Sequence, residues 1–176
     1  MHSTIPGTNK PLKNDEPFKV FKQMIELGDG ISLGQVSSIT GLDPLVIQNW
    51  VKREYVSRPI KKKYYEKQLA RILMINSLRE VMKIEDIGNL MTLINGDVED
   101  ESDDLISEEN LYSLFVRVIY NLESVDDIEK TIKNVMKTEK RNDEKLKVAL
   151  ETMIYAYLAS EMKKVSKGYL NKLETM

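Results

Sequence analysis

The sequence contains no cysteine, which excludes a disulfide framework, a thiolate zinc site and a cysteine nucleophile. Nothing therefore suggests an oxidising compartment, and we expect a cytoplasmic protein. The single histidine is His2, and the sequence has neither a phosphate-binding glycine loop nor a serine in a nucleophile elbow. We expect no enzymatic activity and no metal or cofactor.

Long apolar runs are also missing. No stretch approaches the roughly 20 apolar residues that a membrane span requires, and no apolar run follows a basic N-terminus as in a signal peptide. Hydrophobic residues make up 41% of the 176 residues, enough for one sizeable core or two small ones. The composition predicts a globular protein that is neither secreted nor inserted in a membrane.

Charge is distributed unevenly along the chain, although the net charge is only −2. Residues 52–83 carry ten basic and three acidic side chains, a local charge of +7, whereas residues 85–129 carry fourteen acids and one arginine, a charge of −13. Such a concentrated positive block favours a polyanionic partner. A merely solvated charged face is the alternative.

Apolar spacing divides the chain into four parts. Residues 1–17 are polar, hold three of the five prolines and predict a flexible tail. Residues 18–96 form a first domain that opens with a short amphipathic helix, residues 97–104 an acidic linker, and residues 105–176 a helical domain for dimerisation or effector sensing. The predicted fold is all-α, mainly helical, with a winged helix-turn-helix followed by a C-terminal helical bundle.

Two short helices separated by a tight turn are predicted after residue 31. Ser32 can cap a helix over residues 33–40, Gly41 permits a turn, and Asp43 followed by Pro44 starts a second helix. In a helix-turn-helix the second helix enters the major groove. Projection at 100° per residue turns Trp50 inward with Ile47. The opposite side supplies the candidate base contacts, which are Leu45, Gln48, Asn49 and Lys52.

The segment after the second helix, residues 53–65, is rich in lysine and tyrosine and is interrupted by Pro59. It suits a short two-stranded wing along the DNA backbone, where contacts give affinity without sequence information. The candidate phosphate contacts are Arg53, Arg58, Lys61, Lys62, Lys63 and Tyr65. The alternative for the wing is a hairpin that only makes the protein more soluble. The alternative for Gln48 and Asn49 is that they are surface amides with no role.

Helical apolar spacing recurs five times downstream, over residues 66–82, 84–94, 111–122, 128–135 and 143–167. One helix-turn-helix covers a short site, so we expect a homodimer on palindromic double-stranded DNA. The last of these helices is the best dimer candidate.

The acidic run allows other hypotheses. A calcium-binding EF-hand has ligands near the spacing of Asp97, Glu99, Glu101, Asp103 and Glu108, but Ser102 stands where that loop needs glycine. A solvated linker explains the run better. A further hypothesis is an electrostatic mimic of DNA that competes for the basic wing.

Several stretches resemble MerR-type transcriptional regulators: residues 33–37, 40–42 and 46–53 are similar to their first two helices, and residues 63–65 and 68–69 to their wing and following helix. From about Phe18 onward the chain also resembles an uncharacterised bacterial family known only as a domain of unknown function, through residues 48–53, 68–72, 94–96 and 100–104. The resemblance implies a winged helix-turn-helix.

The departures from the MerR pattern bear on DNA contact. Gln48 and Asn49 replace an arginine and a tyrosine or arginine, and Lys63 replaces the usual wing arginine, which keeps the charge but loses the bidentate fork. The presumed wing tip, residues 59–61, has no glycine, and the thiolates of the metal-responsive branch are absent. We predict a sequence-specific DNA-binding transcriptional regulator with an unknown small-molecule or protein effector. The alternative is a protein–protein interaction module with a degenerate winged helix.

Overall fold

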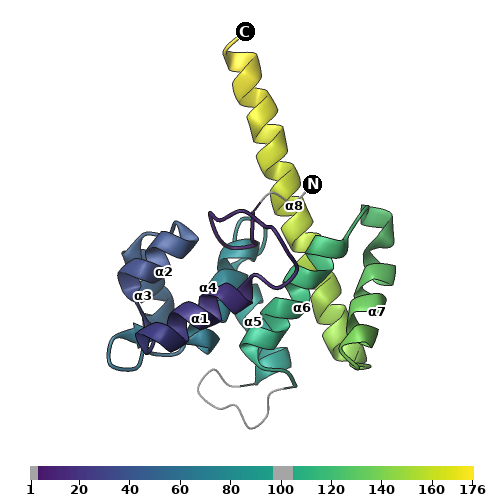
Figure 1. Cartoon of the computed structure of the whole chain (residues 1–176). Helices are drawn as coiled ribbons and strands as arrows, with labels where there is room; N and C mark the ends of the chain where they lie inside the picture. Colours follow the sequence, from purple (N-terminus) through teal and green to yellow (C-terminus); the bar gives the residue numbers. More distant parts are fainter. Residues whose placement is uncertain (1–3, 97–104) are drawn as a thin grey trace.

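The computed structural model describes residues 4–96 and 105–176, and within them the protein is mainly helical, as predicted (Figure 1). Eight α-helices, one 3-10 helix and two short strands occur in these residues. In chain order they are α1 (Phe18–Gly28), β1 (Ile31–Ser32), α2 (Leu33–Thr40), α3 (Pro44–Lys52), β2 (Lys63–Tyr64), α4 (Glu66–Leu78), α5 (Ile84–Asn95), α6 (Glu108–Asn121), η1 (Val125–Asp127), α7 (Ile128–Thr138) and α8 (Glu144–Glu174).

The short helices α2 and α3 begin and end where local chemistry predicts. Ser32 accepts a hydrogen bond from the Gln35 backbone N–H, and the Gln35 side chain accepts one from the Ser32 N–H, which makes a reciprocal capping box. Gly41 ends α2 with a positive φ of 73°. Asp43 then accepts from the Leu45 N–H with Pro44 in the first turn. The tight connection between the two helices therefore follows from the sequence itself.

The two strands form one antiparallel pair in which Ile31 faces Tyr64 and Ser32 faces Lys63. The wing was expected to be two-stranded within residues 53–65, but its strand β2 pairs with β1, which lies before α2. Inside the segment there is a single bridge between Ile60 and Lys63. Pairing with β1 attaches this segment to the start of α2.

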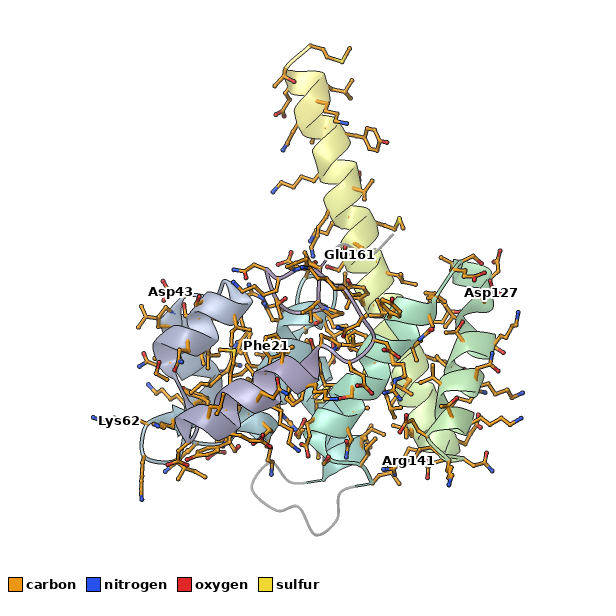
Figure 2. The ribbon with its side chains drawn as sticks, viewed as in Figure 1. Phe21, Asp43, Lys62, Asp127, Arg141 and Glu161 are labelled. Atoms are coloured by element: carbon orange, nitrogen blue, oxygen red, sulfur yellow. The ribbon has the colours of Figure 1, made fainter. Side chains whose placement is uncertain are left out.

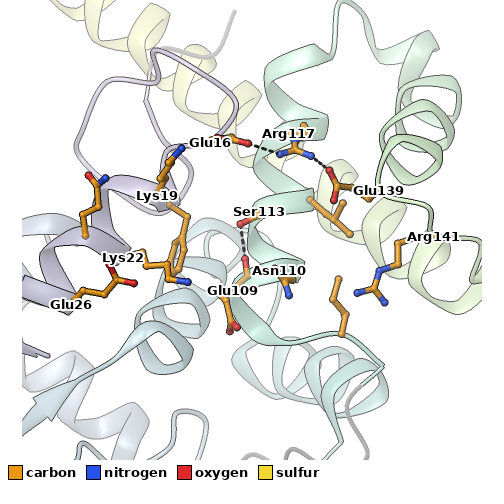
Figure 3. A pocket seen from close by; sticks show the side chains of 14 residues that line it. Glu16, Lys19, Lys22, Glu26, Glu109, Asn110, Ser113, Arg117, Glu139 and Arg141 are labelled. Carbon is orange, nitrogen blue, oxygen red and sulfur yellow. Dashed lines mark hydrogen bonds and ion pairs between the residues drawn. The ribbon is translucent and has the colours of Figure 1, made fainter. Parts of the chain in front are cut away.

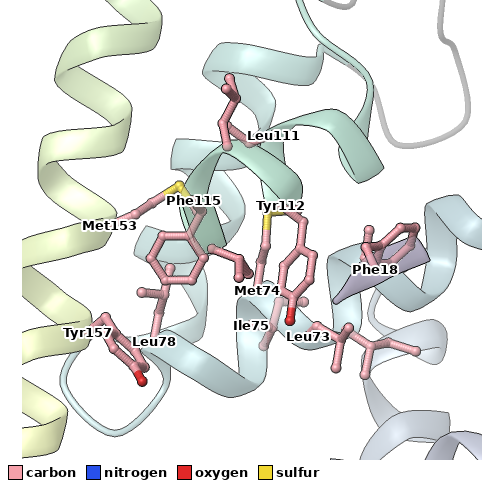
Figure 4. Close-up of a cluster of buried hydrophobic side chains, with 14 of the residues drawn as sticks. Phe18, Leu73, Met74, Ile75, Leu78, Leu111, Tyr112, Phe115, Met153 and Tyr157 are labelled. Carbon is pink, nitrogen blue, oxygen red and sulfur yellow. The ribbon is translucent and has the colours of Figure 1, made fainter. Parts of the chain in front are cut away.

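Helix α4 is the centre of the core and packs against α1, α2, α5, α6 and α8. Most of its side chains are buried, and the apolar cluster around it continues into α6 and α8 (Figure 4). The Tyr112 ring meets Phe18 edge to face at 5.5 Å between centroids, and Phe115 meets Tyr157 at 5.7 Å. The described parts of the two predicted domains thus share one continuous core.

A buried ion pair crosses between these two parts. Arg71 of α4 and Glu108 of α6 pair through side chains that are 2% and 1% exposed. The Arg71 Nε also donates to the Tyr55 carbonyl at 2.8 Å. Because the pair is removed from water, losing either member would leave an uncompensated charge in the core.

Part of the segment expected as a flexible tail contacts the body: residues 5 and 6 are buried, whereas residues 9–11 are exposed. Ile5 is buried at 8% exposure, and the Tyr112 hydroxyl donates to the Pro6 carbonyl at 2.7 Å. The side-chain amide of Asn76 in α4 donates to the Gly7 carbonyl at 2.9 Å. The segment is held by partners far along the chain, which local polarity does not reveal.

Helix α8 is longer than expected, since it continues past residue 167 to Glu174. Its buried side chains end at Ser160, and beyond Glu161 every residue is exposed. This C-terminal half projects away from the body (Figure 1). Within the described residues, no helix combines the length and the apolar character needed to cross a bilayer.

Candidate nucleic-acid interface

The outward face of α3 carries the four side chains predicted as base contacts. Gln48, Asn49 and Lys52 are exposed, and Leu45 is 66% exposed although it is apolar. The opposite face is buried, and Trp50 is only 6% exposed, so the expectation that it packs inward is confirmed. The helix therefore offers two amides, a lysine and one apolar side chain on a single free surface.

A two-residue turn forms the tip of the wing segment, and we call residues Ile60–Lys63 the lysine hairpin. The backbones of Ile60 and Lys63 exchange two hydrogen bonds of 2.9 Å. Between them, Lys61 and Lys62 have positive φ values of 49° and 66°. Positive φ at both central residues marks a type I′ turn, in which asparagine and glycine are the usual residues. The chain thus holds two lysines in a backbone conformation that disfavours them.

The lysine hairpin and the start of α3 lie at the same edge of the molecule. Figure 2 shows Lys62 and Asp43 at the end farthest from α7, with the Lys62 side chain pointing away from the body. Lys61 and Lys62 are both exposed. A long polyanion that passes along this edge would meet both features.

Lys63 and Tyr65, predicted as phosphate contacts, are bonded within the protein. The Lys63 Nζ donates to the Gly28 carbonyl at 2.5 Å. The Tyr65 hydroxyl lies 3.3 Å from the Asp29 carbonyl and 3.2 Å from its carboxylate. Burial and the Asp29 carboxylate raise the pKa of that hydroxyl. Both side chains anchor the hairpin to the connection between α1 and β1.

Arg53 also has an internal partner. Its guanidinium lies 2.9 Å from the Glu85 carboxylate at the start of α5 and over the Tyr55 ring, 4.9 Å from the centroid. The pKa of the Glu85 carboxyl is lowered, first by a hydrogen bond from the Glu85 backbone N–H and second by the hydrogen bond from the Arg53 guanidinium. Glu85 is therefore ionised at neutral pH and competes with any phosphate for Arg53.

The remaining basic side chains of the interface have no such partner. Within residues 4–96 and 105–176, no carboxylate forms an ion pair with any of four exposed cations, which are Lys52, Arg58, Lys61 and Lys62. The six predicted phosphate contacts thus divide into three side chains without an acidic partner and three that are bonded inside the protein. We call Lys52, Arg58, Lys61 and Lys62 the free cations.

A separate polar cleft lies between α1, α6 and the connection from α7 to α8. Its volume is about 680 Å³. Arg117 is held inside it by Glu16, at 3.2 Å, and by Glu139 (Figure 3). Basic and acidic side chains line it in equal number: Lys19, Lys22, Arg117 and Arg141 against Glu16, Glu26, Glu109 and Glu139. The cleft carries no net charge that would select an anion.

Most of the acidic run lies outside the described residues, including the predicted linker at residues 97–104, the proposed DNA mimic and the first four predicted calcium ligands. The fifth predicted calcium ligand, Glu108, is buried and pairs with Arg71. In the part of the chain that is described, no group of three or more histidine or acidic residues is arranged to hold a metal ion.

The geometry defines a mainly helical protein with a small two-stranded antiparallel sheet. The chain belongs to the family described as Domain of unknown function (DUF1836), whose model matches residues 20–115. That match runs from α1 into α6, across the predicted linker. No solved structure matches the chain.

The chain is also similar to the uncharacterized protein YkrK of Bacillus subtilis (strain 168). The two are 26% identical over 127 residues, which cover 70% of this chain and 54% of YkrK. The chain therefore spans about half the length of the curated relative that it matches.

Proposed function

We propose that this protein is a transcriptional regulator that binds double-stranded DNA through a MerR-like winged helix-turn-helix, with α3 in the major groove and the lysine hairpin against the phosphates. One observation carries the proposal. An exposed helix with two unengaged amides lies at the same edge as two lysines held outward by a type I′ turn.

The chemistry of α3 suits base recognition. An asparagine or glutamine amide pairs with N6 and N7 of adenine, and an exposed apolar side chain meets the thymine methyl group. Gln48 and Asn49 supply the amides and Leu45 the apolar group, while Lys52 reaches a guanine or a phosphate. Because α3 presents no arginine, strong bidentate guanine contacts are not part of the proposal.

Affinity would come mainly from the free cations. Each phosphate neutralised on duplex DNA contributes about −0.9 to the slope of log affinity against log salt. Four free cations give a slope of about −3.6 per protomer, if each contacts one phosphate. Two copies on a palindrome would double this value.

The first experiment selects bound fragments from random duplex DNA with the purified protein at two salt concentrations. Enrichment of a common motif supports sequence-specific binding. An affinity that hardly changes with salt, with no enriched motif, would instead support the protein–protein interaction module, because a hydrophobic interface responds weakly to salt.

The second experiment uses two matched lysine variants on the selected site. Lys61→Ala with Lys62→Ala should reduce the magnitude of the slope by about 1.8 per protomer. Lys63→Ala removes the same kind of charge, but its ammonium is bonded to the Gly28 carbonyl. It should leave the slope unchanged, and an equal loss per lysine removed in the two variants would refute the assignment of the free cations.

A further inference from the structure

A basic hollow lies where α7 is joined to α8, at the end of the body opposite α2 and α3 (Figure 1). Its volume is about 730 Å³, and we call it the α7–α8 hollow. Five basic and two acidic side chains line it: Lys133, Lys137, Lys140, Arg141 and Lys147 against Asp143 and Glu144. Unlike the cleft around Arg117, this hollow has an excess of positive charge.

Both acids of the hollow are engaged by neighbouring groups. Asp143 accepts a hydrogen bond from the Leu146 backbone N–H at 2.9 Å and so caps α8. The Glu144 carboxylate lies 3.2 Å from the Lys147 ammonium. In the described residues, three exposed lysines of the hollow form no ion pair with a carboxylate, and we call them the hollow lysines: Lys133, Lys137 and Lys140. Their charge is available to a ligand.

One hollow lysine occupies a backbone position that glycine usually takes. Helix α7 ends in a Schellman motif, in which the Lys140 N–H donates to the Lys137 carbonyl at 3.0 Å and the Arg141 N–H to the Met136 carbonyl at 2.8 Å. The residue at the turn of this motif is left-handed, and glycine is the usual choice because it has no Cβ. Lys140 has a φ of 54°. The chain thus holds an ammonium at the hollow at some cost in backbone strain, which favours a role for that charge.

Acidic side chains border the hollow on both helices. Towards the start of α7, Asp127 lies 3.9 Å from Lys130, and on α8 Glu151 lies 3.6 Å from Lys147. Between these borders the first two hollow lysines are about 6 Å apart along the helix axis. A nucleic acid needs a basic surface that continues along its backbone. A short concave basic site instead suits a small anion.

We propose that the α7–α8 hollow binds a small anion in which two or more phosphate groups are linked. A lysine ammonium is a compact charge with three donors, and it binds phosphate well. Linked phosphates extend over the distance that separates the hollow lysines, whereas a single phosphate concentrates its charge at one point. The side-chain amides of Asn134 and Asn142 line the same hollow and can donate to phosphate oxygens. This inference does not depend on DNA binding, because the hollow and α3 lie at opposite ends of the body (Figure 1).

Titration calorimetry of the full chain without DNA, at low ionic strength, tests the class of ligand. Pyrophosphate should bind about ten-fold more tightly than inorganic phosphate, because it engages further hollow lysines. ADP carries the same linked phosphates and identifies their source. A tighter affinity for ADP than for pyrophosphate assigns the hollow to a nucleotide, and an equal or weaker one assigns it to the bare diphosphate. Pyrophosphate that binds no more tightly than inorganic phosphate overturns the proposal.

The variant Lys140→Gly separates ligand binding from folding. It removes a hollow lysine and places glycine at a positive φ, so the melting temperature should rise while the affinity for pyrophosphate falls about three-fold. Adding Lys137→Ala should increase the loss to about ten-fold. Circular dichroism shows that both variants fold.

The matched control is Lys62→Gly, which makes the same exchange at a lysine with a φ of 66° in the lysine hairpin. It should leave the affinity for pyrophosphate unchanged. Equal losses in Lys62→Gly and Lys140→Gly would mean that the anion responds to general charge or binds at the hairpin, and would overturn the proposal. A Lys140→Gly protein that binds pyrophosphate as tightly as the unmodified chain would also overturn it.

Discussion

The lysine hairpin offers a perturbation in which stability and DNA binding should move in opposite directions. Its two central residues, Lys61 and Lys62, have φ values of 49° and 66°. An ordinary residue in the left-handed region costs roughly 1–2 kcal/mol, because its Cβ approaches the following carbonyl. Asparagine tolerates this region and glycine has no Cβ, so the variant Lys61→Asn with Lys62→Gly carries the residues that the turn prefers.

The gain in stability follows from these terms. Removing the backbone strain at both positions should stabilise the folded state by about 2 kcal/mol. The larger conformational entropy of glycine in the unfolded chain offsets roughly 0.5–1 kcal/mol of this gain. We expect the free energy of unfolding to rise by about 1–1.5 kcal/mol, or roughly 2–6 °C in melting temperature for a chain of this size. Urea unfolding followed by circular dichroism measures the change.

The same variant should bind DNA more weakly. It removes two of the four free cations, so the salt slope should fall in magnitude by about 1.8 per protomer. Lys130→Gln with Lys133→Gln removes two charges from α7, at the far end of the body (Figure 1), and serves as the control. A destabilised hairpin variant would refute the strain argument. A stabilised variant with unchanged affinity would show that the hairpin does not touch DNA.

Three further variants test other contacts. Glu85→Gln should free the arginine that it pairs with and increase the magnitude of the salt slope by up to about 0.9 per protomer; an unchanged slope would place that arginine away from phosphate. Gly7→Ala should cost about 2 kcal/mol or more in urea unfolding, because Gly7 has a φ of 76° and a Cβ there would lie 2.1 Å from the Leu73 carbonyl oxygen. Arg71→Met should cost about 3–5 kcal/mol, and most of the loss should return when Glu108 is also replaced by methionine; a double variant as unstable as the single one would contradict the account of the buried pair.

Features determined by short-range chemistry could be predicted from the sequence. The start of α2 follows from the reciprocal bonds of Ser32 and Gln35, and the start of α3 from Asp43 and Pro44. The inward position of Trp50 follows from helical periodicity alone. Each of these features involves residues no more than one helical turn apart.

Contacts between distant residues could not be predicted. Lys63 bonds to a carbonyl 35 residues earlier, and Tyr112 to one 106 residues earlier. For this reason the sequence does not reveal the internal hydrogen bond of Lys63, a predicted phosphate contact, or the contacts that residues 5–7 of the predicted tail make with the body. The hairpin tip was expected at residues 59–61 but lies at Lys61 and Lys62, because no glycine marks the turn.

The local charge of +7 over residues 52–83 overstates what a polyanion would meet. Arg71 is neutralised by Glu108 inside the core, and Arg53 is shared with Glu85 on the surface. What remains without an acidic partner in α3 and the segment after it is the set of free cations, all within residues 52–62, and the exposed Arg79 lies over the Trp50 ring of α3. Six phosphate contacts would give a salt slope of about −5 per protomer, whereas the four free cations give about −3.6. The measured slope therefore distinguishes the charge counted along the sequence from the charge that the folded protein leaves available.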